Sequence, residues 1–209
     1  MWIAIAAVVL VAVAVAAFFL VRDQRIEAAN CDAVHTLDLL LGEPVGTGEP
    51  LTVVGDSYTQ GWGLEDPTSS WVAELPNSVT IHAASGSGFT RGGLCDGGSI
   101  TELAEGVTGA TILQGGLNDV SASPTDLHAA VSRAIDVVDG DVVLVGPALA
   151  PAVDAAALER VDAVLAEVAA EHDVVYISAL GWDLEYSDGI HLTEDGHQVF
   201  GEMVAAVLE

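Results

Sequence analysis

The sequence predicts an α/β fold in which helices cover a parallel sheet. From residue 51 onward, short runs of β-branched apolar residues alternate with longer stretches of helical periodicity, which is typical of strands joined by crossover helices. The length of 209 residues suits one such domain with a full core better than two comparable domains. A long apolar segment precedes this domain. We therefore expect a single domain with an N-terminal appendage.

Five strands are expected, each a short apolar run with Gly, Pro, Asn or Asp beside it: Leu51–Val54, Ser78–His82, Ala110–Gln114, Asp141–Val145 and Val174–Ser178. Helix start signals lie between them. Ser123 and Pro124 provide an N-cap and a first-turn proline. Pro151 is expected to open an Ala-rich helix that runs to Glu171, and a threonine is expected to cap the last helix, over 193–208. The elements therefore alternate as a parallel sheet requires.

The segment from residue 2 to residue 21 is uninterrupted Ala, Val, Ile, Leu, Phe and Trp. A helix of this length rises about 30 Å, which matches the hydrocarbon core of a bilayer. We expect residues 1–21 to form an uncleaved transmembrane anchor, because no Lys or Arg precedes the run and no clean cleavage site follows it. A cleaved signal peptide is the alternative. Residues 22–50 then form a stalk and linker, and residues 51–209 the domain.

Two features of the sequence favour opposite orientations of this anchor. Arg22 and Arg25 follow the span directly, and the positive-inside rule would keep the domain in the cytoplasm. Cys31 and Cys95 are the only cysteines, as expected for a single disulfide in an oxidising compartment. Two unrelated thiols are the alternative. We expect the disulfide, and with it an extracytoplasmic domain at the cell surface.

Charge excludes several classes of partner. The chain has 31 acidic residues, five basic ones and a formal net charge of −26, so nucleic acid and anionic lipid head groups would be repelled. Membrane contact should then depend on the anchor alone. The chain has no Lys, which excludes a Walker A phosphate loop. The acidic stretch 183–189 lacks the spacing of a calcium loop, and the histidines lack metal-ligand spacing. We expect no metal and no cofactor.

Residues with chemical potential follow the strands, where an open parallel sheet binds its ligand. A serine in Gly55-Asp56-Ser57 follows the first strand and would by itself more often be an N-cap than a nucleophile. A glycine-rich turn over 84–90 follows the second strand and would by itself be a flexible loop. The remaining pieces are Gly116-Leu117-Asn118-Asp119 after the third strand and Asp188-Gly189-Ile190-His191 after the fifth.

These pieces, in this order, resemble the SGNH or GDSL hydrolase family, from about Leu51 to the C-terminus. The resemblance implies a flavodoxin-like three-layer fold with sheet order 2-1-3-4-5, and hydrolysis of esters or thioesters. It implies Ser57 as the nucleophile and Asp188 with His191 as the acid/base pair. The oxyanion hole would comprise the Ser57 N–H, the Asn118 side-chain amide and a glycine N–H. For that glycine, Gly88 fits the family pattern best and Gly86 is the alternative.

The chemistry of the residues agrees with these roles. A serine hydroxyl needs a base to take its proton, and His suits that task near neutral pH. An Asp beside the imidazole fixes its tautomer and stabilises the imidazolium. The loop 179–192 is long enough to bring the histidine back from the edge strand to the serine.

We therefore expect a serine esterase acting on a small-molecule or glycan ester. An acyltransferase with the same acyl-enzyme and a non-catalytic binding module are the alternatives. Three aromatic residues on loops near the expected site are candidates to line an acyl or sugar pocket: Trp62, Phe89 and Trp182.

Overall fold

The computed structural model describes residues 31–32, 34, 37 and 43–208. The chain divides into two compact units, residues 1–36 and 37–209, and the strands that the structure describes lie in the second. Within the described residues, no helix is long and apolar enough to span a membrane. The predicted anchor over 1–21 and most of the predicted stalk lie outside the described residues.

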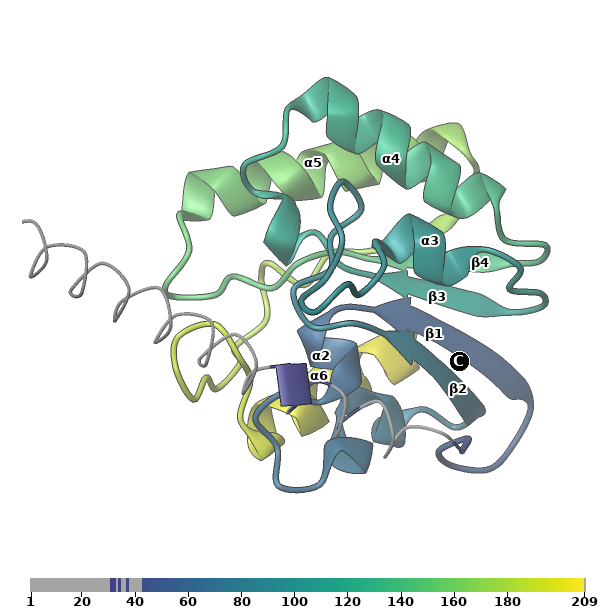
Figure 1. Cartoon of the computed structure of the whole chain (residues 1–209), viewed down its shortest axis with the longest axis vertical. Coiled ribbons are helices and arrows are strands. Elements are labelled where there is room, and N and C mark those ends of the chain that lie inside the picture. Colours follow the sequence, from purple (N-terminus) through teal and green to yellow (C-terminus); the bar gives the residue numbers. More distant parts are fainter. Residues whose placement is uncertain (1–30, 33, 35–36, 38–42, 209) are drawn as a thin grey trace, which may run out of the picture. The chain divides into compact units, whose positions relative to one another are not determined.

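The sheet has five strands: β1 (Pro50–Gly55), β2 (Ser78–Ala83), β3 (Thr111–Gln114), β4 (Val142–Val145) and β5 (Val175–Ile177). All four pairings are parallel, and the order is β2-β1-β3-β4-β5. Both the predicted order and the predicted strands are confirmed, with each boundary within one residue of its expected place. The carboxyl ends of β1, β2 and β3 are therefore neighbours at one edge of the sheet (Figure 1).

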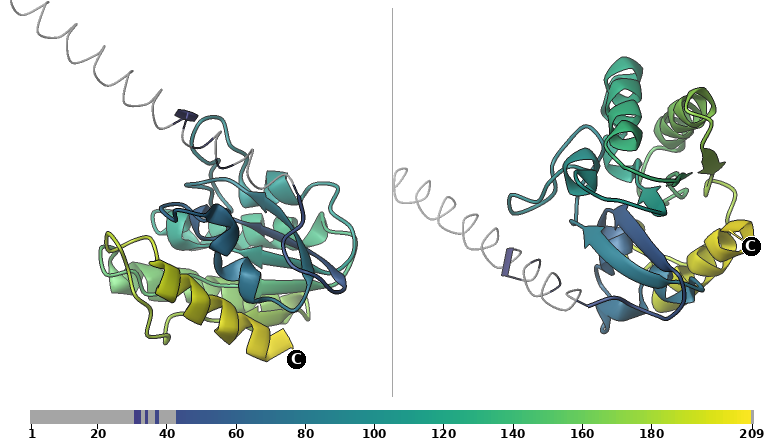
Figure 2. Two further views of the ribbon diagram at one scale, coloured as in Figure 1. Left: turned by 90° about the horizontal axis from the view of Figure 1, so that it is seen from below. Right: turned by 90° about the vertical axis from the view of Figure 1, so that its right-hand side faces the viewer.

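Helices lie on both faces of the sheet (Figures 1 and 2). The longer ones are α4 (Pro124–Asp136), α5 (Ala155–Glu171) and α6 (Glu194–Leu208), and the short ones are α2 (Ser57–Gln60), α3 (Ile100–Ala104), η1 (Pro67–Ser69), η2 (Trp71–Glu74) and η3 (Leu117–Asp119). The start of α5 corrects one expectation. Pro151 does not open this helix, because the Asp154 carboxylate accepts the Ala157 N–H at 2.8 Å and is the N-cap.

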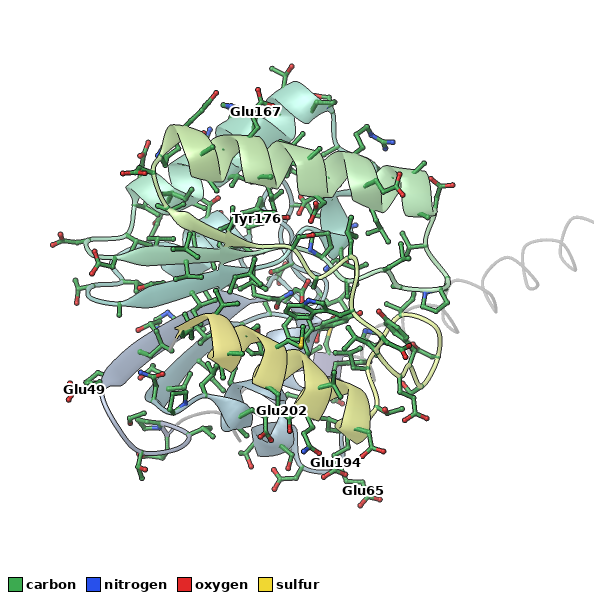
Figure 3. All side chains as sticks on the ribbon, turned by 180° about the vertical axis from the view of Figure 1, so that it is seen from behind. Glu49, Glu65, Glu167, Tyr176, Glu194 and Glu202 are labelled. Carbon is green, nitrogen blue, oxygen red and sulfur yellow. The ribbon has the colours of Figure 1, made fainter. Side chains whose placement is uncertain are left out.

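The sheet separates two hydrophobic cores, which makes the fold a three-layer sandwich. One core lies under α6 and η2 and includes Trp71 and Phe200. The other lies under α3, α4 and α5 and includes Leu127 and Leu165. In Figure 3 the labelled glutamates point outward from the ribbon, whereas Tyr176 lies between α5 and the sheet.

Cys31 and Cys95 are both disulfide-bonded. This is the state that the predicted Cys31–Cys95 disulfide requires, since the chain has no other cysteine.

Candidate active site

The nucleophile candidate lies in the first turn of α2, directly after β1. The Asp56 carboxylate caps this helix by accepting the Tyr58 N–H at 3.0 Å. Ser57 is therefore the first helical residue and not the N-cap. Gly55 has no room for a side chain, because a Cβ there would overlap the Thr59 hydroxyl. The sequence Gly-Asp-Ser thus produces a tight strand-to-helix turn with the serine at the carboxyl end of β1, between β2 and β3 in the sheet.

Asp188 and His191 form the predicted pair. The His191 Nδ1 lies 2.8 Å from the Asp188 Oδ2, and the other carboxylate oxygen accepts the main-chain N–H groups of His191 at 2.7 Å and Ile190 at 2.9 Å. Hydrogen bonds from His191, chiefly from its ring, lower the pKa of Asp188 to about 2. The carboxylate is therefore ionised at neutral pH and holds Nδ1 as the protonated ring nitrogen. The Nε2 atom remains to take a proton.

A cavity of about 240 Å³ brings the two halves of the site together. Its walls are Ser57, Trp62, Ser85, Gly86, Leu94, Leu117, Asn118, Ile190 and His191. No hydrogen bond joins Ser57 to His191 among the described residues, and such contacts often tighten only when substrate binds. A larger cavity of about 590 Å³ lies beside α3 and α4 and contains none of the predicted catalytic residues. Chemistry, and not size, therefore identifies the site.

Asn118 follows β3 and lies in the wall of this cavity. Its side-chain Nδ2 donates to the Ser87 carbonyl at 2.8 Å and lies 3.5 Å from an Asp56 oxygen. The first bond fixes the amide plane, and the second Nδ2 hydrogen has only a long contact. Burial raises the pKa of Asp56 to about 6. The Asn118 amide is thus anchored on the loop after β2 while remaining accessible from the cavity.

The structure distinguishes between the two candidate glycines. The Gly88 N–H donates to the Arg91 carbonyl at 3.0 Å, and Gly88 is not part of the cavity wall around Ser57. Gly86 is part of that wall, and its N–H makes no hydrogen bond within the part of the chain that the structure describes. The geometry therefore favours Gly86, the alternative, over Gly88.

Gly88 has a different structural requirement. A Cβ there would lie 2.6 and 2.7 Å from the two carboxylate oxygens of Asp119. These oxygens accept the main-chain N–H groups of Phe89 and Thr90, both at 2.9 Å, and the Thr90 hydroxyl at 2.6 Å. Asp119 therefore clamps the loop after β2, and only glycine at position 88 leaves room for it.

Sequence reasoning assigned no role to three polar residues at this site. They are Asp119, Tyr58, whose hydroxyl donates to the Ile190 carbonyl at 2.6 Å, and Gln60, whose Oε1 accepts the Ser85 N–H at 2.9 Å. All three are nearly fully buried. The available signal was their position, because each lies within three residues of a predicted catalytic residue.

The aromatic candidates have different positions. Trp62 lies in the cavity wall, and its ring centroid is 6.3 Å from that of His191. Phe89 is buried in the core under α3 and α4, and Trp182 packs against Phe200 at 5.1 Å between ring centroids. Of the three, only Trp62 contacts the cavity around Ser57.

Comparison with known proteins shows the family and the fold. The model of the GDSL-like lipase/acylhydrolase family matches residues 53–199. Est24, a carbohydrate acetylesterase from Sinorhizobium meliloti, has a similar structure (TM-score 0.61, 15% identity, 77% of this chain and 98% of that one). The aryl esterase of M. smegmatis is similar to the same degree (TM-score 0.61, 19% identity, 77% and 98%). At these identities the likeness shows the fold alone. No curated protein matches the sequence.

Proposed function

Because the chain belongs to the GDSL-like lipase/acylhydrolase family and is an ester hydrolase, we propose that it cleaves carboxylic esters through an acyl-enzyme on Ser57. The single observation that carries the proposal is the shared cavity. Ser57, Asn118 and the Asp188-bound His191 come from three separate segments and reach one small space.

The proposed reaction has two stages. Ser57 Oγ attacks the acyl carbon while His191 Nε2 takes the hydroxyl proton, so that a C–O bond forms and the carbonyl oxygen becomes an oxyanion. The ester C–O bond then breaks, and the imidazolium returns the proton to the leaving alkoxide. Water repeats both steps on the acyl-enzyme and releases the acid. Asp188 remains ionised and stabilises the imidazolium in each stage.

The oxyanion needs donors that are already in place. We assign this role to the N–H groups of Ser57 and Gly86 and the Asn118 amide. Gly86 and Asn118 belong to loops that follow β2 and β3, the two neighbours of β1 in the sheet. Preorganised donors of this kind typically contribute about 3 kcal/mol each to transition-state stabilisation.

We propose a short acyl group on a carbohydrate or small-molecule alcohol as the substrate. The volume of about 240 Å³ is below the range of about 300–1,000 Å³ usual for drug-sized ligands. Trp62, Leu94, Leu117 and Ile190 provide its apolar wall. The structural neighbours include a carbohydrate acetylesterase and an aryl esterase, which supports the same substrate class.

We also propose that the domain acts outside the cytoplasm, attached by the apolar segment over 2–21. The disulfide-bonded cysteines support an oxidising compartment. Protease digestion of intact cells should therefore remove the domain, whereas protection of the domain until the cells are lysed would place it inside.

The function is tested with the purified protein and p-nitrophenyl esters of increasing chain length. We expect turnover that is highest for acetate or butyrate, and labelling of Ser57 by a fluorophosphonate. Ser57→Ala should abolish both turnover and labelling. The control is Ser178→Ala, at an exposed serine that directly follows β5, and it should change neither. Absence of both turnover and labelling in the wild-type protein would refute the proposal.

A further inference from the structure

Helix α2 connects the proposed nucleophile to three other parts of the site. The side chains of Tyr58, Thr59 and Gln60 follow Ser57 and are 2% exposed or less. Tyr58 bonds the loop before α6, Thr59 bonds Gln114 at the end of β3, and Gln60 bonds the loop after β2. Each residue of this one turn therefore contacts a different element.

Tyr58 is attached to the loop that carries the acid/base pair. Its hydroxyl donates to the Ile190 carbonyl at 2.6 Å, and Ile190 is the neighbour of His191. Edge contacts with His197 and Phe200, at 6.1 and 6.0 Å between ring centroids, hold the Tyr58 ring. Burial raises the pKa of Tyr58 above its usual value, so the hydroxyl remains a donor. The bond joins the helix of the proposed nucleophile to the main chain of the residue just before the proposed general base.

Gln60 is attached to the loop that carries the proposed oxyanion donor. Its Oε1 accepts the Ser85 N–H at 2.9 Å and the Ser85 hydroxyl. Ser85 immediately precedes Gly86, and both residues lie in the cavity wall. A displacement of Ser85 would therefore move the Gly86 N–H relative to Ser57.

We propose that Tyr58 and Gln60 are positioning residues with separate tasks: Tyr58 holds the general base, and Gln60 holds the oxyanion donor. The inference rests on the proposed function. The two tasks differ chemically, because His191 must also protonate the leaving alkoxide. A poor leaving group needs that proton, whereas p-nitrophenolate leaves without it. Oxyanion stabilisation is needed equally for both kinds of ester.

The experiment compares kcat/KM for ethyl acetate and p-nitrophenyl acetate, which share an acyl group. Titration of Ser57 with a fluorophosphonate corrects for inactive protein. For Tyr58→Phe we expect kcat/KM for ethyl acetate to fall by about tenfold. The fall in kcat/KM for p-nitrophenyl acetate should be about threefold smaller. For Gln60→Met we expect equal losses with the two esters, of about tenfold.

Tyr176→Phe is the matched control. It also removes a hydroxyl, a partly buried one that donates to Asp162. Neither of these residues lines the cavity around Ser57, so the ratio between the esters should remain unchanged. A purely structural role for Tyr58 predicts equal losses with both esters, and that result would overturn its assignment. For Gln60→Met, a loss of kcat/KM that differs between the two esters, or no loss at all, would overturn the assignment of Gln60.

Each variant tests its own residue, so failure of one to fold leaves the second test in place. If wild-type protein neither cleaves the two esters nor reacts at Ser57, the proposed function itself is refuted. If wild-type protein is active and the leaving-group pattern is absent, only the positioning roles are refuted.

Discussion

The role of Gly88 gives a quantitative prediction. If the glycine exists to admit the Asp119 carboxylate, Gly88→Ala should destabilise the protein only while that carboxylate is present. The new Cβ would lie 2.6 and 2.7 Å from the carboxylate oxygens, against an ordinary contact of 3.4 Å or more. Overlap of this size in a packed interior costs about 1–3 kcal/mol.

The partner substitution is Asp119→Ala. It removes the acceptor of the Phe89 and Thr90 N–H groups, which should cost about 2–4 kcal/mol because buried donors are left without a partner. In the double variant the methyl group at position 88 meets no carboxylate, so the cost of Gly88→Ala should fall below about 0.5 kcal/mol. The expected coupling free energy is therefore about 1–3 kcal/mol.

Urea unfolding at 25 °C on the four proteins of this cycle measures the coupling. Gly181→Ala is the control, since a Cβ at Gly181 has no atom within 4 Å, and it should change the unfolding free energy by less than about 0.5 kcal/mol. Equal costs of Gly88→Ala with and without Asp119 would refute the reasoning.

Three further predictions concern single side chains. Asn118→Ala should lower kcat by about 10²–10³-fold and the unfolding free energy by about 1 kcal/mol, through its bond to Ser87. Asp188→Asn should lower kcat by about 10²–10⁴-fold, because the amide no longer fixes the tautomer of His191. Burial lowers the pKa of His197 from 6.5 to about 4. As pH falls, the unfolded chain binds a proton on this imidazole before the folded protein does. The free energy of unfolding should therefore fall between pH 6.5 and pH 4, by about 3 kcal/mol, since each pKa unit corresponds to about 1.4 kcal/mol.

Separate measurements check these outcomes. Steady-state kinetics with urea unfolding tests Asn118→Ala, and a loss of stability without a loss of kcat would contradict it. For Asp188→Asn, unchanged kcat at neutral pH would be the contrary result. For His197, the measurement is the difference in unfolding free energy between wild type and His197→Asn, followed as a function of pH. Taking this difference separates the contribution of His197 from that of Asp56, which both proteins contain. The raised pKa of Asp56 acts in the opposite direction, since its contribution is lost as pH rises through about 6. A difference that is constant from pH 7 to pH 4 would contradict the reasoning.

The strands were predictable because the strands of a parallel sheet covered by helices on both faces are short, mostly apolar runs. Runs such as Val142–Val145 leave little choice of boundary. Helix starts were less certain. Pro151 satisfies the local rule for a first turn, but the Asp154 carboxylate forms the cap three residues later, and a sequence pattern does not weigh these against each other.

The candidate catalytic residues were predictable because the family motifs name them, and the structure brings Ser57, Asn118 and His191 to one cavity. The glycine was not, since both candidates share one short loop. The deciding observation is the wall of the cavity around Ser57, which is formed by segments far apart in the chain and includes Gly86 but not Gly88. The roles of Tyr58 and Gln60 likewise depend on partners far along the chain. Local patterns contain no information about such pairs.

The bond between Tyr58 and Ile190 spans 132 positions in the chain, and this has a consequence during biosynthesis. The turn that carries the proposed nucleophile, Ser57, emerges from the ribosome early, whereas the proposed acid/base pair, Asp188 and His191, emerges near the end. A nascent or truncated chain that ends before residue 188 can complete four or five strands and still have no general base. Such a chain should have no esterase activity, which should first arise when the segment that carries Asp188 and His191 packs against Tyr58.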